Sequence, residues 1–189
     1  MSDAIWVIES IETSKYPMAE YDHDRSSMES YNTLIGEPFP EEGEAMLTVD
    51  CSLEAIAGRS ILSCTSHCLF LRGPASDLFR ELGPAVSIKR ATLRAENGVC
   101  SDAVLVKPLV IAECLDRDAS RIDWLWKGRY VSRVHRLVLK AGCMEGHDFV
   151  RDEATGLLLI SDRIKAALEG IDADAFAAVR PKDYRTGRR

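Results

Sequence analysis

The sequence has no long hydrophobic run and no excess of basic residues. No uncharged apolar stretch approaches the roughly 20 residues that a membrane helix needs. The opening MSDAIWVIES shows no basic segment followed by an apolar one, the pattern of a secretory signal peptide. The formal net charge of -6 argues against the concentrated cationic surface that general nucleic-acid binding requires. We therefore expect a cytoplasmic protein that binds neither membranes nor nucleic acid.

Common catalytic motifs are also missing. The chain contains no G-x-G-x-x-G, Walker A, G-x-S-x-G or H-E-x-x-H pattern. These are the commonest short motifs of nucleotide-binding proteins, hydrolases and zinc proteases. No cofactor is predicted. The six cysteines are expected to be reduced and mostly buried, because disulfides are uncommon in the cytosol.

The pattern of short elements predicts an α+β fold with a mainly antiparallel sheet and a few helices. With 189 residues, 46% of them hydrophobic, the chain can form a single compact unit or two packed halves, about 1–95 and 96–181, before a basic tail at 182–189 that we expect to be mobile. Pro108 divides the apolar stretch 102–115, which predicts an edge strand with a bulge or two short strands. Further strands are expected near 4–10, 45–53, 85–95, 116–126, 128–146 and 147–156.

A strand followed by a capped helix occurs twice. In GLLLISDRIKAALEG, an apolar strand at 157–160 is followed by the helix-capping pair Ser161-Asp162, with Gly170 as the helix stop. In CLFLRGPASDLFRELG, a strand at 69–71 is followed by a helix from Ser76-Asp77, after an apparent three-residue insertion at 73–75. The similarity suggests a duplicated unit that serves as scaffold rather than as an active site.

Acidic residues dominate the first quarter of the chain. Residues 9–44 include ten acids but only two basic residues, Lys15 and Arg25. An acidic surface of this kind would attract a basic partner. The binding-surface candidates are the acids and one aromatic anchor, Glu41, Glu42, Glu44, Asp116, Asp118, Asp123 and Trp126. The acids at 41–44 and 116–118 could instead hold a cation or act in acid–base chemistry, although solvated charge at turns is the simpler interpretation. Trp126, which shares a strand face with Trp124, could instead pack in the core.

The sequence Cys64-Thr-Ser-His67-Cys68 is the one metal-like cluster. It places three soft ligands within five residues, and His135, His147 or Cys143 could complete a tetrahedral zinc shell. However, no second closely spaced ligand pair exists, and Cys68 leads directly into an apolar strand, so buried thiols are the simpler interpretation. The alternative function is therefore a small metal- or thiol-dependent enzyme centred on these residues.

The order of elements from residue 104 to 170 resembles the second half of the bacterial polymorphic-toxin immunity proteins of family eleven. The first shared features are a hydrophobic strand followed by Asp and Ser, here Cys114-Leu-Asp116 and Ser120, and an LVL strand at 137–139. The others are a Phe before a turn, here Phe149, and a hydrophobic-Ser-Asp sequence that opens a helix, here at 160–162. Upstream, GEPF at 36–39 and the strand leading into SDLFREL are similar to that family's first half.

The resemblance implies a non-enzymatic immunity protein that binds and neutralises a cognate toxin, such as a secreted nuclease, in the producing cell. Its shared motifs are structural and none is catalytic. The residues at 73–75 and the acidic N-terminal segment have no counterpart in the family pattern. We expect toxin specificity to lie in such variable segments.

Overall fold

The computed structural model describes residues 4–9, 17–34, 36–65, 67–125 and 131–186. The chain forms two compact units. Unit 1 combines residues 1–9, 110–166 and 178–189, and unit 2 combines residues 10–109 and 167–177. The predicted boundary near residue 95 falls inside one β-hairpin of unit 2, so the chain does not divide into sequential halves.

Unit 2 is built on a six-stranded sheet in the order β2-β3-β6-β7-β5-β4. All of its neighbouring strands are antiparallel except β3 and β6, which run parallel. The strands are β2 (Glu20–Tyr21), β3 (Ala45–Thr48), β4 (Ile61–Leu62), β5 (Leu69–Arg72), β6 (Val86–Ala95) and β7 (Gly98–Pro108). The unit also contains the short helices η1 (Ser30–Thr33), α1 (Leu53–Ile56) and η2 (Gly83–Ala85), and the longer helix α2 (Gly73–Arg80).

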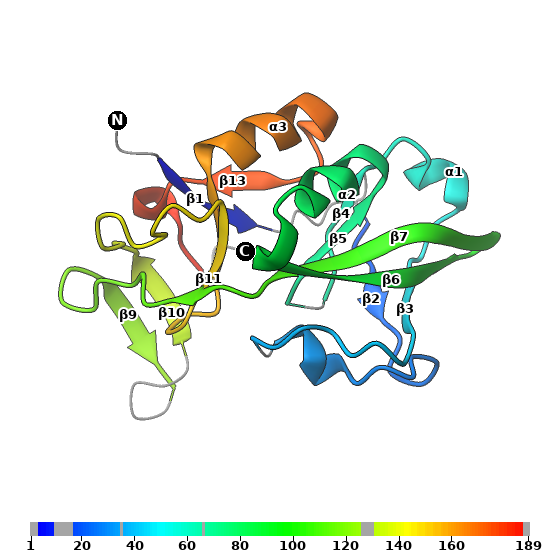
Figure 1. Ribbon diagram of the computed structural model, residues 1–189, viewed down its shortest axis with the longest axis horizontal. Coiled ribbons are helices and arrows are strands. Elements are labelled where there is room, and N and C mark those ends of the chain that lie inside the picture. Colours follow the sequence, from blue (N-terminus) through cyan, green and yellow to red (C-terminus); the bar gives the residue numbers. More distant parts are fainter. Residues whose placement is uncertain (1–3, 10–16, 35, 66, 126–130, 187–189) are drawn as a thin grey trace. The chain divides into compact units, whose positions relative to one another are not determined.

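Strand β7 lies at the centre of this sheet, between β6 and β5, so the predicted edge position is wrong. The alternative, a division into two strands at Pro108, is confirmed, because β7 ends there and β8 (Ile111–Ala112) follows. Six consecutive residues, 103–108, are buried, because both faces of the strand are covered. In Figure 1, α2 lies above the green β6–β7 hairpin and the blue-to-cyan segment before β3 lies below it. Pro108 is the last residue of β7. Its missing N–H therefore does not break the hydrogen-bond ladder between residues inside the strand.

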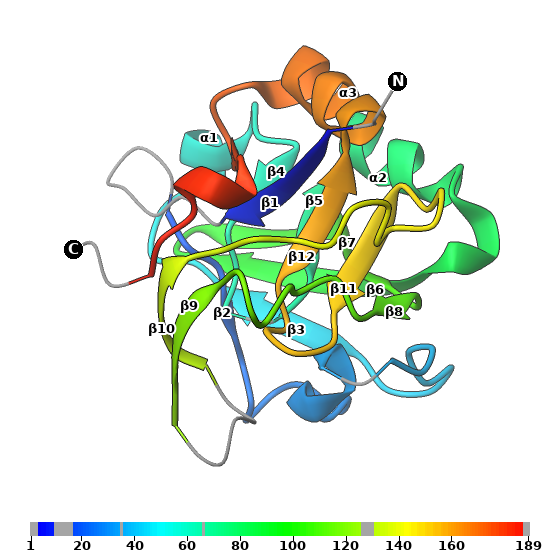
Figure 2. The same cartoon turned by 90° about the vertical axis from the view of Figure 1, so that its left-hand side faces the viewer.

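Unit 1 contains a five-stranded sheet in the order β13-β1-β12-β11-β8 and a two-stranded ribbon, β10-β9 (Figure 2). The strands are β1 (Ile5–Glu9), β8 (Ile111–Ala112), β9 (Arg121–Trp124), β10 (Val131–Arg136), β11 (Phe149–Asp152), β12 (Leu158–Ser161) and β13 (Ala177–Val179), with the short helix η3 (Pro181–Asp183). Tyr184 is buried in the core of this unit with Val7, Leu115 and Leu159. The chain from residue 182 to 186 is therefore packed rather than a detached tail.

The two strand-to-helix corners are present, but they begin differently from the prediction. Helix α3 (Asp162–Asp172) follows β12 directly, and the Ser161 hydroxyl accepts a 3.3 Å hydrogen bond from the Ile164 amide as an N-cap. The helix continues past Gly170. Helix α2 starts at Gly73, so residues 73–75 are its first turn and not an insertion; Pro74 is tolerated there because the first amides of a helix have no intrahelical partner.

Taken together, the sheets and helices confirm the predicted α+β class with mainly antiparallel sheets. The predicted strands at β1, β3, β5, β6, β9, β11 and β12 are confirmed, and residues 53–56 form the short helix α1. Among the described residues, no helix is both long and apolar enough to cross a membrane.

Candidate protein-binding surface

The acidic segment of unit 2 is an ordered structure and not a loose loop. In the described residues from 17 to 48, the only Lys or Arg is Arg25, and its guanidinium is paired with Asp22 at 2.9 Å. Seven acids of this segment are exposed and define what we call the acidic surface, namely Glu20, Asp24, Glu29, Glu37, Glu41, Glu42 and Glu44. The acidic surface therefore carries negative charge that the segment's one arginine does not offset.

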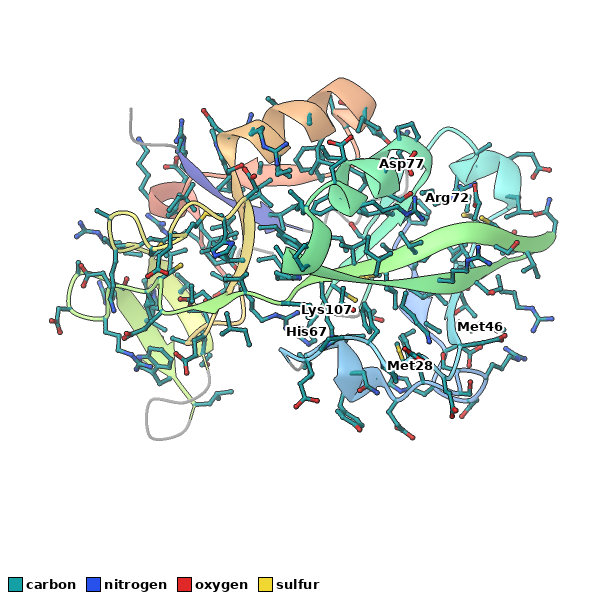
Figure 3. All side chains as sticks on the ribbon, viewed as in Figure 1. Met28, Met46, His67, Arg72, Asp77 and Lys107 are labelled. Carbon is teal, nitrogen blue, oxygen red and sulfur yellow. The ribbon has the colours of Figure 1, made fainter. Side chains whose placement is uncertain are left out.

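Backbone hydrogen bonds join the loop after β2 to the start of β3. The amides of Ser27 and Met28 both donate to the Glu44 carbonyl at 3.1 Å, and the Glu44 amide donates to the Ser27 hydroxyl at 2.8 Å. The Asp22 amide donates to the Met46 carbonyl at 2.9 Å. Met28 and Met46, labelled in Figure 3, come from the two segments that these bonds connect. The acids on both segments are thus held in one local structure.

The turn that carries Glu41, Glu42 and Glu44 is fixed from the neighbouring strand β6. The Lys89 ammonium donates to the backbone carbonyls of Pro40, Glu41 and Glu42 at 2.7, 2.8 and 3.1 Å. All three glutamate side chains remain exposed. One lysine thus orders the backbone of the turn while its carboxylates stay accessible to a partner.

Gly43 closes this turn in a conformation that other residues rarely adopt. Its φ angle is +83°, and a Cβ atom built there would lie 3.2 Å from the Met28 amide nitrogen. Left-handed backbone is costly for residues with a Cβ atom. Both the backbone angle and the close approach therefore require glycine at this position.

We expect Gly43→Ala to destabilise unit 2 by about 1–3 kcal/mol, the usual cost of forcing a Cβ into left-handed backbone plus a tight contact. Chemical denaturation followed by circular dichroism measures the loss. Gly58→Ala is the matched control, because a Cβ at Gly58 meets no atom within 4 Å and no positive φ is recorded there. Equal stability of the two variants would contradict the proposed structure of the turn.

A buried lysine anchors the preceding part of the segment to the sheet. Lys107, on β7 and labelled in Figure 3, is fully buried, and its ammonium donates to the Asn32 carbonyl. The same ammonium lies 4.3 Å from the centre of the Phe39 ring, and the Phe39 amide donates to the Ser87 hydroxyl at 2.8 Å. These contacts hold Asn32 and Phe39 against the sheet face and so give the acidic surface a fixed shape.

Two large apolar side chains are exposed beside these acids. Tyr31 in η1 is 57% exposed and Leu34, which follows η1, is 47% exposed. Tyrosines surrounded by polar groups are common anchors of protein–protein interfaces. Sequence reasoning missed both residues, although their i, i+3 spacing in an otherwise polar segment was a usable signal.

Two of the candidates from unit 1, Asp116 and Asp123, make local side-chain contacts. The Asp116 carboxylate accepts hydrogen bonds from the amides of Asp118 and Ala119 at 3.1 and 3.0 Å, which stabilises a turn. Asp123 lies 2.7 Å from His135 across the β9–β10 ribbon. Asp118 is exposed. Trp126 lies outside the described residues.

The alternative metal site at Cys64, His67 and Cys68 is not assembled in the described part of the chain. Cys64 and Cys68 are buried, as expected, whereas His67 is exposed, and the Cys64 thiol donates to the Cys68 carbonyl at 3.2 Å. No group of three or more His, Cys, Asp or Glu side chains in that part could hold a metal ion. All six cysteines are free thiols, with Cys114 also buried and the other three half-buried.

Unit 1 contains a cavity of about 850 Å³ whose charge is opposite to that of the acidic surface. Its lining includes the cations Arg136, Lys140, Arg180 and Lys182, against the acids Glu145 and Asp148. A basic partner would not be attracted to this cavity. The acidic surface of unit 2 is therefore the better candidate for such a partner.

Comparison with known proteins adds no assignment to this surface. No protein-family model matches the chain, and no curated protein is significantly similar to it in sequence.

Proposed function

We propose that this protein is an immunity protein that binds a cognate antibacterial toxin and neutralises it without catalysing a reaction. The observation that supports this proposal best is the acidic surface, where seven exposed acids lie on a backbone fixed by Lys89, Lys107 and Gly43. Tyr31 and Leu34 add apolar contact area at the same place. Negative charge around exposed apolar groups suits a basic protein partner.

Charge complementarity explains what such a surface would achieve. An acidic surface accelerates association with a cationic protein and disfavours acidic partners, whereas buried apolar contacts slow dissociation. A secreted nuclease fits this description, because a nuclease must bind phosphate through a cationic site. Covering that site would block its substrate, so binding alone would be sufficient for protection.

The fixed backbone should increase affinity. Ordering a flexible segment on binding costs free energy, and a surface already held in its bound shape avoids much of that cost. The hydrogen bonds from Lys89 and the Ser27–Glu44 contacts restrict the acidic turn before any partner arrives. The proposal therefore predicts little rearrangement of residues 20–48 on binding.

We expect Tyr31→Ala to weaken toxin binding about 10-fold while leaving the melting temperature nearly unchanged, because its side chain is mostly exposed. Calorimetry with the purified toxin measures the change. Val99→Ala is the control, since Val99 is 58% exposed and lies on β7, outside the acidic surface. Equal effects of the two substitutions would argue against Tyr31 as an anchor.

Co-expression with the product of the adjacent gene tests the proposed function. We expect the two proteins to co-purify through affinity and size-exclusion steps as a stable complex at physiological salt. An adjacent product that is toxic when expressed alone, yet does not form a complex with this protein, would contradict inhibition by direct binding.

A further inference from the structure

Two cysteines of unit 1 that are distant in sequence are brought together beside a cavity. Cys114 follows β8 and is fully buried, while Cys143 lies in the turn at 141–146 and is half-buried. An isolated antiparallel bridge pairs Leu115 with Leu139, and the Lys140 amide donates to the Cys114 carbonyl at 2.8 Å. The turn that carries Cys143 thus begins immediately beside Cys114.

The Cys114 side chain contacts the backbone of Cys143. The Cys114 thiol lies 3.5 Å from the Cys143 carbonyl oxygen, to which it donates. The neighbouring Cys114 thiol lowers the pKa of Cys143 below its ordinary value. The interaction with Cys143, together with burial, raises the pKa of Cys114. Because Cys143 is half-buried at a cavity whereas Cys114 is fully buried, Cys143 is the thiol that a reagent reaches first, and the directions of the two pKa shifts agree with this assignment.

The backbone of Cys114 is rigidly held. The buried Asp152 carboxylate accepts hydrogen bonds from the amides of Cys114 and Leu115 at 3.0 and 2.8 Å. Cys143, in contrast, lines a cavity of about 440 Å³ together with Glu113, Lys140 and His147. A small reagent can therefore approach Cys143 from the cavity, while Cys114 stays fixed behind it.

The other half-buried cysteines lack these features. Burial raises the pKa of both Cys51 and Cys100, which disfavours the reactive thiolate at neutral pH. For Cys100, a hydrogen bond from its thiol to the Asp102 carboxylate further favours the protonated form. Cys51 and Cys100 therefore serve as internal controls of similar exposure.

We propose that Cys143 and Cys114 form a peroxide-reactive pair that closes to a disulfide. The Cys143 thiolate attacks one oxygen of hydrogen peroxide, the O–O bond breaks, and the products are Cys143 sulfenic acid and hydroxide. The Cys114 sulfur then attacks the Cys143 sulfur, the S–O bond breaks, and the Cys114 proton leaves with the hydroxyl group as water. In total, two thiols are oxidised to one disulfide while one peroxide is reduced to two waters.

The disulfide would connect two parts of unit 1 that the reduced protein joins only by noncovalent contacts. It would tie the turn at 141–146 to the segment after β8. That turn lines the 440 Å³ cavity and contributes to the lining of the 850 Å³ cavity. Oxidation would therefore restrict the movement of the turn at 141–146, which lines both cavities. This effect does not depend on toxin binding at the acidic surface.

Peroxide treatment of the folded full-length protein tests this proposal. Peptide mass spectrometry should find a Cys114–Cys143 link with the loss of two hydrogens, and iodoacetamide should modify Cys143 at least about 10-fold faster than Cys51 or Cys100 at pH 7. Because the thiolate reacts, the advantage of Cys143 should shrink as the pH rises and the other thiols ionise.

Single substitutions separate the two roles. In Cys114→Ser the peroxide product should remain at the sulfenic acid, trapped by dimedone at Cys143, whereas Cys143→Ser should give neither the link nor the adduct. A Cys51→Ser/Cys100→Ser variant should still form the link. Absence of the link in the folded wild-type protein, or modification of Cys51 and Cys100 as fast as Cys143, would overturn the proposal.

Discussion

Replacing Glu41, Glu42 and Glu44 together with lysine is expected to weaken toxin binding by about 100-fold at low salt, equivalent to about 2.7 kcal/mol. The three side chains are exposed on one ordered turn, so the substitutions change the surface charge by six units without disturbing a core. Attraction between exposed charges mainly increases the association rate. We therefore expect slower association with a smaller change in dissociation, measured by surface plasmon resonance with the purified toxin.

The same charge change elsewhere provides the control. Glu81, Glu96 and Glu153 are also exposed and lie outside the acidic surface. Their joint replacement by lysine alters the net charge equally. Any greater loss of toxin affinity in the Glu41/Glu42/Glu44 variant is therefore due to the position of these acids on the acidic surface. The difference should shrink in high salt, because screening acts over about 8 Å at physiological ionic strength. Unchanged affinity of the Glu41/Glu42/Glu44 variant at low salt would reject this surface.

Asp152→Ala is expected to reduce the unfolding free energy of unit 1 by about 3 kcal/mol. Asp152 is 1% exposed, and its carboxylate accepts four hydrogen bonds, from the amides of Cys114, Leu115 and Thr155 and from the Thr155 hydroxyl. Alanine would leave these donors without their acceptor, and the desolvation cost of unpaired buried groups is about 1–3 kcal/mol each before relaxation. Urea denaturation followed by tryptophan fluorescence reports this unit, since Trp6 and Trp124 lie in it.

Two further variants make the Asp152 prediction specific. Glu153→Ala changes the adjacent exposed acid and should alter stability by less than about 0.5 kcal/mol. Asp152→Asn retains one oxygen acceptor and should lose less stability than alanine. A wild-type transition midpoint for Asp152→Ala would show that the carboxylate does not organise the chain around Cys114.

Local sequence patterns were sufficient for most elements of the fold. The apolar runs at β5 and β12 and the capping residue Ser161 are short-range signals, and the structure uses them as expected. The predictions failed where position in the sheet mattered. Pro108 indicated an edge strand, but burial of 103–108 depends on a helix and a long segment that cover β7 from opposite faces. Likewise, residues 73–75 were expected to be an insertion before the helix, although Pro fits well in the first turn of a helix.

The candidate binding surface was predictable only in its charge. The excess of acids in the first quarter of the chain is visible in the sequence, and Glu41, Glu42 and Glu44 are exposed as expected. Its backbone support was not predictable, because Lys89 contacts carbonyls 47 to 49 residues away and Lys107 contacts Asn32 at a separation of 75. The pairing of Cys114 with Cys143 similarly depends on a chain reversal near Leu139 that carries no local motif.

The most direct test of the central claim is a growth assay in which the product of the adjacent gene is expressed with wild-type protein or with the Glu41/Glu42/Glu44→Lys variant. The proposal predicts that the adjacent product is toxic alone, that wild-type protein restores growth, and that the variant restores it poorly at equal protein levels. An adjacent product that is harmless, or full protection by the variant, would contradict a toxin inhibitor acting through the acidic surface.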